Sequence, residues 1–233
     1  MTSVRIAQAN PRYRSVIVRE PSEGVRRALN VMVAATGVVL TAPAMAAIAL
    51  LIKLTSRGPV FYTQLRVGID RRLPGEPAGN SRRHVDHGGK PFKIYKFRTM
   101  APRGGPAVDE VWAERGDPRV TPIGRILRQY RLDELPQLLN VLLGDMDVVG
   151  PRPEQPSIFA RLRHEIDRYG ERQRVRPGIT GWAQINQSYD SCVEDVRSKL
   201  KYDLEYIRRQ SALEDLRIML RTLPAVLFKQ GGW

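Results

Sequence analysis

Cysteine and histidine are scarce in this chain of 233 residues, which holds one cysteine and three histidines. The single cysteine, Cys192, excludes an internal disulfide framework and suits a reducing, cytoplasmic environment. His84 and His87 flank Asp86 in a loop at 70–90, but two imidazoles without nearby cysteines rarely hold a metal ion. We therefore expect a solvated loop there.

Acidic residues are few relative to basic ones. There are 24 Asp and Glu against 38 Lys and Arg, which gives a formal net charge of +14. Such an excess predicts a polyanionic neighbour, and nucleic acid, anionic lipid and nucleotide phosphates all qualify. The sequence contains no helix-turn-helix, zinc-finger or RNA-binding-sheet pattern, which disfavours nucleic acid.

Charge is missing altogether from residues 28–52, a run long enough to cross about 30 Å of hydrocarbon as a helix. A cleaved secretory signal is disfavoured, because the polar stretch before the run is long and the run continues past the cleavage-like segment at 42–47. A buried core helix is disfavoured because the run has no charged face. We expect this segment to lie in a membrane.

Two features of this run predict that it enters and leaves the membrane on one side. Pro43 removes a backbone hydrogen bond and the Thr41 hydroxyl can satisfy a freed carbonyl, so we expect a bend. Basic residues flank both ends, whereas a single span has an asymmetric distribution. A re-entrant membrane helix over 26–57 is our prediction, with a kinked spanning helix as the alternative. The flanking residues are Arg19, Arg26 and Arg27 before the run and Lys53, Arg57 and Arg66 after it.

The rest of the chain alternates between helical and strand patterns. Residues 1–25 lack periodicity and predict a surface arm. Residues 58–68 and 90–100 predict short strands. The apolar positions of 196–223 mark two amphipathic helices broken near Ser211, which either dock on the core or lie on the membrane surface.

The expected fold is thus mixed α/β and mainly helical. It has one N-terminal re-entrant membrane helix, membrane-surface amphipathic helices and a small β-sheet.

The feature that most strongly suggests chemistry is a pair of adjacent carboxylates, Asp133 and Glu134. They precede leucines at helical spacing and a stop at Gly144. Asp133 stands where the N-cap of that helix belongs, so a capped core helix is the plain structural interpretation. The surrounding motifs favour a functional site.

Several basic residues are candidates for binding phosphate groups. Lys96 and Arg98 alternate with aromatics in the strand at 90–100, although a solvated strand face is the usual explanation of such alternation. Arg152 lies between two prolines that fix the backbone, so it loses less entropy on binding phosphate. Arg176 adjoins a loop at 174–186 with two glycines, a tryptophan and two amides, a composition that often holds a ligand.

Taken together, these motifs resemble one family, the bacterial sugar transferases that are monotopic polyprenyl-phosphate phosphoglycosyl transferases, in their short form. The resemblance spans roughly residues 25 to 230. It rests on the Pro-broken membrane helix, Lys-Phe-Arg-Thr-Met at 96–100, Asp-Pro-Arg at 117–119, Leu-Asp-Glu-Leu-Pro-Gln-Leu at 132–138, Gly-Asp-Met at 144–146, Gly-Pro-Arg-Pro at 150–153 and Arg-Pro-Gly-Ile-Thr-Gly-Trp at 176–182.

The resemblance implies transfer of a phospho-sugar from a UDP-sugar to undecaprenyl phosphate, with release of UMP. It assigns Asp133 as the nucleophile that forms a phospho-aspartyl intermediate and Glu134, with Asp133 nearby, as the ligand of a Mg²⁺ cofactor. A carboxylate is ionised at neutral pH and needs no base, but its attack on a diphosphate requires positive charge nearby. The candidate sources are Mg²⁺, Lys96, Arg98, Arg119, Arg152 and Arg176.

The resemblance also implies a setting. Residues 58–233 would form a cytoplasmic catalytic domain at the bacterial inner membrane, acting in the first membrane step of exopolysaccharide or capsule synthesis. The partners would be the UDP-sugar donor, the undecaprenyl phosphate acceptor and membrane lipid, with no nucleic acid. A homo-oligomer is allowed, and the sugar is not specified.

Three departures from the family pattern leave alternatives open. The loop at 70–90 is longer than expected, and Arg131 replaces a usual Ser or Thr. Asp147 often corresponds to Ser, so Asp145-Met-Asp147 imitates the metal-binding Asp-x-Asp of direct glycosyltransferases, which form no covalent intermediate. A membrane-anchored basic scaffold or nucleic-acid-binding protein is the other alternative.

Overall fold

The computed structural model describes residues 23–71, 88–101, 117–187 and 192–227. Nearly all of the predicted arm at 1–25 and most of the loop at 70–90, with His84, Asp86 and His87, lie outside the described residues.

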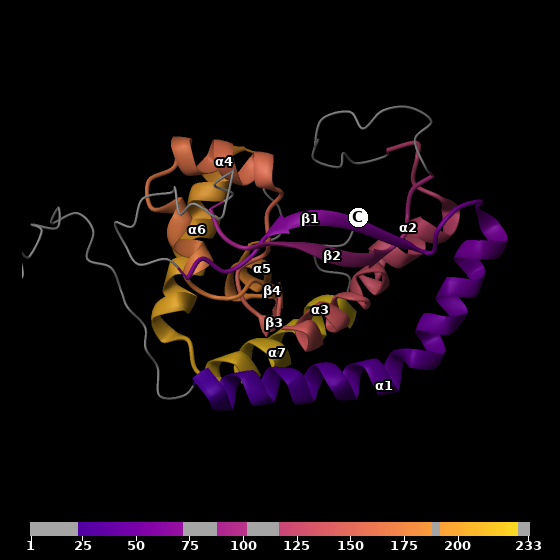
Figure 1. Cartoon of the computed structure of the whole chain (residues 1–233), viewed down its shortest axis with the longest axis horizontal. Coiled ribbons are helices and arrows are strands. Elements are labelled where there is room, and N and C mark those ends of the chain that lie inside the picture. The colour runs from indigo at the N-terminus through magenta and orange to yellow at the C-terminus, as the bar shows by residue number, and fades with distance from the viewer. Residues whose placement is uncertain (1–22, 72–87, 102–116, 188–191, 228–233) are drawn as a thin grey trace, which may run out of the picture.

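The described chain is mainly helical and carries two small sheets, which confirms the mixed, mainly helical fold class (Figure 1). The strands are β1 (Phe61–Val67), β2 (Pro91–Phe97), β3 (Asp147–Val149) and β4 (Gly178–Thr180). The helices are α1 (Glu23–Thr55), α2 (Pro122–Gln129), α3 (Gln137–Leu143), α4 (Pro156–Glu165), α5 (Trp182–Asn186), α6 (Val193–Arg209) and α7 (Ala212–Leu227), with short 3₁₀ helices η1 (Leu132–Glu134) and η2 (Tyr169–Arg174).

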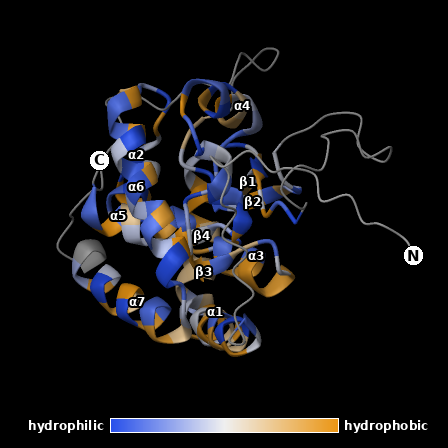
Figure 2. Cartoon of the chain, turned by 90° about the vertical axis from the view of Figure 1, so that its left-hand side faces the viewer, coloured by the Kyte–Doolittle hydropathy of each residue, from blue (hydrophilic) through white to orange (hydrophobic). Residues whose placement is uncertain are grey.

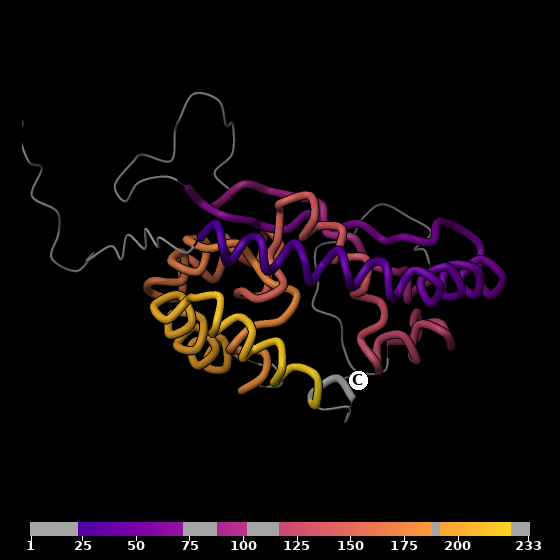
Figure 3. The backbone as a smooth tube through the Cα atoms, turned by 90° about the horizontal axis from the view of Figure 1, so that it is seen from below, coloured from indigo at the N-terminus to yellow at the C-terminus, as the bar shows by residue number. Residues whose placement is uncertain are grey.

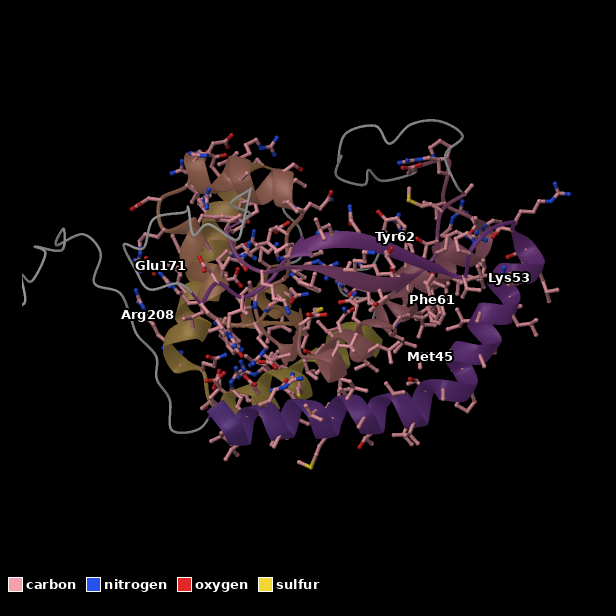
Figure 4. All side chains as sticks on the ribbon, in the orientation of Figure 1. Met45, Lys53, Phe61, Tyr62, Glu171 and Arg208 are labelled. Atoms are coloured by element: carbon pink, nitrogen blue, oxygen red, sulfur yellow. The ribbon has the colours of Figure 1, made fainter. Side chains whose placement is uncertain are left out.

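The apolar run forms the long helix α1, whose composition and length suffice to cross a membrane. Only 11% of its most apolar window is buried inside the structure, so it is not a core helix. Figure 1 shows two arms of α1 at a pronounced angle, and Met45 lies at the bend in Figure 4, next to Pro43. The Thr41 hydroxyl donates to the carbonyl of Gly37 at 2.7 Å. The carbonyl that Pro43 frees is that of Val39, so this detail of the predicted bend was wrong.

The first turns of α1 are fixed to the rest of the chain by buried ion pairs. Arg26 lies 3.0 Å from Asp147 and 3.3 Å from Asp215 of α7. Arg27 lies 2.9 Å from the second oxygen of Asp147 and also donates to the Val141 carbonyl of α3. Figure 4 shows polar atoms gathered where this arm meets the domain.

The other end of α1 is bound to the same domain. Arg98, which follows β2, donates to the carbonyls of Ser56 and Arg57 at 2.9 Å each. It therefore satisfies carbonyls at the end of the helix, where the helix itself provides no donors. The two ends of α1 are therefore both bound to the same folded domain.

The strands predicted at 58–68 and 90–100 are confirmed as the antiparallel pair β1 and β2, in which Tyr62 faces Lys96. The side of β2 away from β1 is bound by Asn140 of α3. Its amide oxygen accepts from the Tyr95 N–H at 3.0 Å and its amide nitrogen donates to the Lys93 carbonyl at 2.8 Å. One side chain thereby fixes α3 against the strand that carries Lys96.

The segment at 174–186, predicted as a ligand-holding loop, instead forms β4 and α5, so that prediction was wrong in its local structure. Strand β4 pairs in parallel with β3. A Cβ on Gly178 would lie 2.0 Å from the Gly150 nitrogen, so the glycine permits a close backbone approach.

The carboxylate pair does not cap a helix as predicted. Asp133 and Glu134 lie in η1, and α3 begins only at Gln137, preceded by Pro136. The predicted stop at Gly144 is confirmed, because this residue takes a left-handed conformation with φ +89°. The pair sits one turn before the helix, where its side chains are available for other contacts.

Helix α3 turns its polar residues inward. Gln137 and Asn140 are buried, whereas Leu139, Leu142 and Leu143 are 38%, 39% and 66% exposed. Of the four leucines in the predicted pattern, the core-helix interpretation is wrong for Leu139 and Leu142, whereas Leu135 and Leu138 pack against apolar clusters.

The two amphipathic helices predicted at 196–223 are confirmed as α6 and α7, with the break at Ser211. Ile218 of α7 is fully buried, but a stripe of leucines is exposed on its other side. Helices α7 and α3 lie along the first arm of α1 on one side of the molecule (Figures 2 and 3). We call the exposed leucines of these three helices the apolar face: Leu40, Leu50, Leu51, Leu54, Leu139, Leu142, Leu143, Leu213, Leu216, Leu220 and Leu223.

The main apolar cluster lies above this face and joins β2, α3, β3, α6 and α7. Its members include Phe92, Val141, Val149, Ile207 and Ile218. Each such side chain contributes about 1.5–3 kcal/mol when fully buried. The cluster holds the strand of Lys96, the turn before Arg152 and the helix after Glu134 in one rigid unit.

Candidate active site

The structure brings four predicted side chains to one place. The Oε1 of Glu134 accepts from Lys96 Nζ at 2.8 Å and from Arg152 Nη2 at 2.7 Å. A longer contact of 3.4 Å joins Arg152 Nη1 to Oε2. Glu134 is 8% exposed, so its charge is balanced by two cations in a nearly dry setting. Asp133 precedes it in η1 and is equally buried.

Asp133 differs from its neighbour in having an uncommitted carboxylate. Among the described residues no hydrogen bond or ion pair to it is observed, whereas Glu134 has two partners. The charges of Lys96, Arg128 and Arg152 nevertheless act on Asp133. This is the arrangement that a nucleophile requires, with electropositive surroundings and free lone pairs.

Burial gives the two carboxylates opposite pKa shifts. Desolvation and the charge of Glu134 raise the pKa of Asp133 to about 6. Burial would also raise the pKa of Glu134, but the charges and hydrogen bonds of Arg152 and Lys96 hold it well below its usual range. Burial lowers the pKa of Lys96 despite Glu134. At neutral pH both carboxylates are ionised, and Asp133 is the more basic of the two.

Three other predicted phosphate-binding residues have different partners. Arg98 binds the end of α1, and Arg119 forms a close ion pair with Asp117. Arg176 lies 3.5 Å from Glu23 at the start of α1. The structure does not bring these three arginines to the carboxylate pair, and their phosphate-binding role stays a prediction.

Two basic residues that were not predicted as part of the site lie near the pair or near Arg152. Arg128 of α2 precedes Asp133 by little more than one helical turn, and its Nη2 lies 3.7 Å from the Met100 sulfur. Because the basic helix α2 leads directly into η1, the sequence did contain a signal that could have identified Arg128 as a neighbour of the pair. Arg66 of β1 donates to the Pro153 carbonyl at 3.0 Å, and its charge acts on Glu154. Nothing in the sequence connected it with Arg152.

The sequence of the chain was also compared with those of known proteins. Residues 21–229 match the model of the bacterial sugar transferase family. The chain belongs to this family. The resemblance drawn from the motifs is thereby confirmed.

Several curated relatives in the family have names that describe their reactions. A UDP-glucose:undecaprenyl-phosphate glucose-1-phosphate transferase of Caulobacter vibrioides is 42% identical over 87% of this chain and 69% of its own length. A UDP-N-acetylgalactosamine-undecaprenyl-phosphate N-acetylgalactosaminephosphotransferase of Aeromonas hydrophila is 38% identical, over 87% of this chain but only 44% of its own length. The exopolysaccharide production protein ExoY of Rhizobium meliloti is 32% identical over 89% of this chain and 88% of its own length.

The chain therefore spans less than half the length of the Aeromonas relative and most of the length of the Rhizobium one.

The Asp145 and Asp147 alternative gains no support from the structure. Asp147 is fully buried and forms ion pairs with both Arg26 and Arg27. In the part of the chain that the structure describes, no group of three or more metal-binding side chains occurs. An Asp-x-Asp metal site is thus disfavoured by the contacts of its second aspartate.

The carboxylate pair fits a magnesium ion whose ligands are supplied partly by the protein and partly by a substrate. Mg²⁺ in phosphoryl-transfer sites is usually bound by one or two carboxylates together with phosphate oxygens and waters. Glu134 Oε2 has only the long contact to Arg152, and Asp133 is uncommitted. These two side chains would hold the ion, with the diphosphate supplying further oxygens.

Proposed function

We propose that this protein is an undecaprenyl-phosphate sugar-1-phosphate transferase, which transfers a phospho-sugar from a UDP-sugar to undecaprenyl phosphate and releases UMP. The observation that carries the proposal is the uncommitted, buried Asp133 beside Lys96, Arg128 and Arg152. The family and the names of the relatives support the same reaction class.

In the first step, an Asp133 oxygen attacks the phosphorus that bears the sugar. The bond from this phosphorus to the bridging oxygen breaks, and UMP leaves with the bridging oxygen. Lys96 and Arg152 exchange part of their contact with Glu134 for the diphosphate oxygens, because phosphate is a strong acceptor of charged hydrogen bonds. The product is a phospho-sugar ester of Asp133.

In the second step, a phosphate oxygen of undecaprenyl phosphate attacks the same phosphorus. The acyl phosphate bond to Asp133 breaks, the carboxylate is restored, and the lipid diphosphate sugar is formed. Glu134 keeps Lys96 and Arg152 oriented through both steps. When bound at Asp133 and Glu134, Mg²⁺ would neutralise diphosphate charge and improve UMP as a leaving group.

We further infer that α1 is re-entrant. Its 33 residues measure roughly 50 Å along the axis, yet both ends bind the same domain. The bend next to Pro43 lets the two arms enter and leave the membrane on one side. A straight span would have to carry one end away from its partners.

The apolar face supports a membrane position for the whole domain. The leucines of α3 and α7 extend the exposed surface of α1, and Arg217 and Arg221 border the leucine stripe of α7. A basic amphipathic helix of this kind binds anionic lipid surfaces. We place the domain at the inner face of the bacterial cytoplasmic membrane, where the acceptor's phosphate also lies. The Rhizobium relative's name supports exopolysaccharide synthesis as the process.

The reaction is tested by measuring UMP release from purified protein in lipid nanodiscs. The assay contains undecaprenyl phosphate, Mg²⁺ and a panel of UDP-sugars that includes UDP-glucose and UDP-N-acetylgalactosamine. The wild type should release UMP with at least one donor, Asp133→Asn should not, and Asp145→Asn is the matched control that should. Release of UDP, or loss of activity in Asp145→Asn but not in Asp133→Asn, would favour direct glycosyl transfer. No nucleotide product from any donor would overturn the proposal.

A further inference from the structure

The segment that carries Arg152 is fixed at every residue. From residue 149 to residue 154, the main chain of every residue makes a hydrogen bond to one of four elements, α6, β4, η2 and β1, although the segment itself is neither helix nor strand beyond Val149. The bonds are Tyr206 Oη to the Val149 carbonyl (3.1 Å), Gly150 N to the Thr180 carbonyl (2.9 Å), Gly178 N to the Pro151 carbonyl (2.9 Å), Arg172 Nη2 to the Arg152 carbonyl (3.0 Å), Arg66 Nη1 to the Pro153 carbonyl (3.0 Å) and Val67 N to the Glu154 carbonyl (2.9 Å).

The bond at Arg152 itself comes from Arg172 of η2, whose side chain is 1% exposed. The Nε of Arg172 donates to Asp203 of α6 at 2.7 Å, and its Nη1 donates to the Tyr169 hydroxyl. Its Nη1 also lies 3.6 Å from Glu154. Each of its nitrogens therefore has a partner, and its geometry is fully determined.

The two prolines around Arg152 do not fix the tilt of the peptide between residues 152 and 153, and the contact with Arg172 restrains it. Pro153 restricts Arg152 to extended conformations, but the plane of the peptide between them can still tilt. The Arg152 carbonyl lies in that plane, and Arg172 holds it. Tilting the plane would move the base of the Arg152 side chain relative to Glu134.

We propose that Arg172, oriented by Asp203, is a positioning residue for the phosphate chemistry of Arg152. This inference rests on the proposed function, in which Arg152 must turn from Glu134 to the diphosphate. The side chain of Arg152 is 34% exposed and free to make that exchange, while its main chain stays in place. Lysine cannot replace Arg172. The planar guanidinium binds Asp203, Tyr169 and the Arg152 carbonyl at once, whereas a single ammonium group cannot reach all three.

A double-mutant cycle tests the link between the two arginines. The single-turnover rate of UMP release is measured for wild type, Arg172→Lys, Arg152→Ala and the double variant, without lipid acceptor. Arg172→Lys should lower the rate about 10- to 100-fold, since displacements near 1 Å have effects of that size. In the Arg152→Ala background the same change should have less than about a twofold effect, because the residue through which it acts is gone.

Arg168→Lys is the matched control. Arg168 belongs to the same turn and also forms a forked ion pair, with Glu171 at 2.8 and 2.9 Å, but on the surface and without contact to residue 152. It should retain the wild-type rate within twofold.

If thermal unfolding shows that Arg172→Lys does not fold, the cycle is repeated with Asp203→Asn as a milder change. It keeps an acceptor for Arg172 but removes the charge, and its rate loss should likewise vanish in the Arg152→Ala background. Equal rate losses in both backgrounds, with an active wild type, would overturn this inference alone. A wild type that releases no UMP would overturn the proposed function and this inference together.

Discussion

At the scale of single residues, the site separates the roles of two adjacent carboxylates through their environments. The positive charges of Lys96 and Arg152 stabilise the ionised form of Glu134, which therefore stays negatively charged and orients both cations. Asp133 is desolvated and uncommitted, so it is the more basic group. When the surroundings of two neighbouring carboxylates separate their pKa values, the two groups are suited to different chemical roles.

The pH dependence of the first step follows from the pKa of Asp133, which is about 6. Protonation removes the nucleophilic lone pair, so the single-turnover rate of UMP release at sub-saturating UDP-sugar and Mg²⁺, which reports the free protein, should fall about tenfold for each pH unit below 6. Omitting the lipid acceptor excludes the titration of its phosphate from the profile. A rate that is constant down to pH 4.5 would contradict this assignment.

The same shift predicts an effect on stability. A carboxyl group whose pKa is raised on folding from 3.8 to about 6 destabilises the folded state above pH 6, and this cost disappears as the pH falls towards 4. Asp133→Asn should therefore stabilise the protein at pH 8, by at most about 3 kcal/mol for two units of pKa, and by about half as much at pH 5.

Thermal unfolding in nanodiscs at both pH values, with Asp145→Asn as the control, measures this difference. An Asp133→Asn variant that unfolds at a lower temperature than wild type at pH 8 would show that Asp133 stabilises the fold rather than serving chemistry.

Motif spacing predicted some members of the site and could not predict others. The pair Asp133 and Glu134 and the cations Lys96 and Arg152 were identified from short motifs, and the fold brings these four together. The positions of Arg98 and Arg176 could not be predicted, because their partners lie at the two ends of α1, far away in sequence. The contacts of Arg172 likewise depend on tertiary packing that leaves no local pattern.

At the scale of elements, the inward polar face of α3 explains why a leucine-rich helix was misjudged. Leucines at helical spacing usually mark the buried face of a soluble helix. In α3 the buried positions include Gln137 and Asn140, and three leucines, Leu139, Leu142 and Leu143, lie on the apolar face beside α1. Periodicity predicted the helix and its end at Gly144, but not which side faces the core, because lipid and core favour the same side chains.

Asn140 should be essential to the placement of β2. Asn140→Ala leaves the Tyr95 N–H and the Lys93 carbonyl without their partner, which should destabilise the fold by roughly 2–4 kcal/mol. UMP release should fall as well, because Lys96 follows these residues on the strand. Asn186→Ala is the matched control, since its amide bonds only to a carbonyl of its own helix. Unfolding midpoints equal to wild type in Asn140→Ala would contradict this role.

At the scale of the whole molecule, the two attachments of α1 determine how the domain meets the membrane. The helix is joined to the core by Arg26 and Arg27 at its start and by Arg98 at its end. The bend between these attachments and the adjoining apolar face predict a domain seated on one leaflet.

Cysteine labelling measures this topology. In a Cys192→Ser background, cysteines replace Gly24, where an added Cβ meets nothing within 4 Å, and Thr55 at the other end of α1. Both should react with a membrane-impermeant maleimide in inverted inner-membrane vesicles, and neither should react in intact spheroplasts. Labelling of the two positions from opposite sides would show that α1 spans the membrane.

Covalent catalysis by Asp133 is tested by intact-protein and peptide mass spectrometry after the protein is mixed with a UDP-sugar but no lipid acceptor. We expect one phospho-sugar adduct, located on Asp133, together with one equivalent of UMP. The adduct should be absent from Asp133→Asn, present in Asp145→Asn, and lost when undecaprenyl phosphate is added. Release of nucleotide only when the acceptor is present, with no adduct at any time, would contradict covalent catalysis.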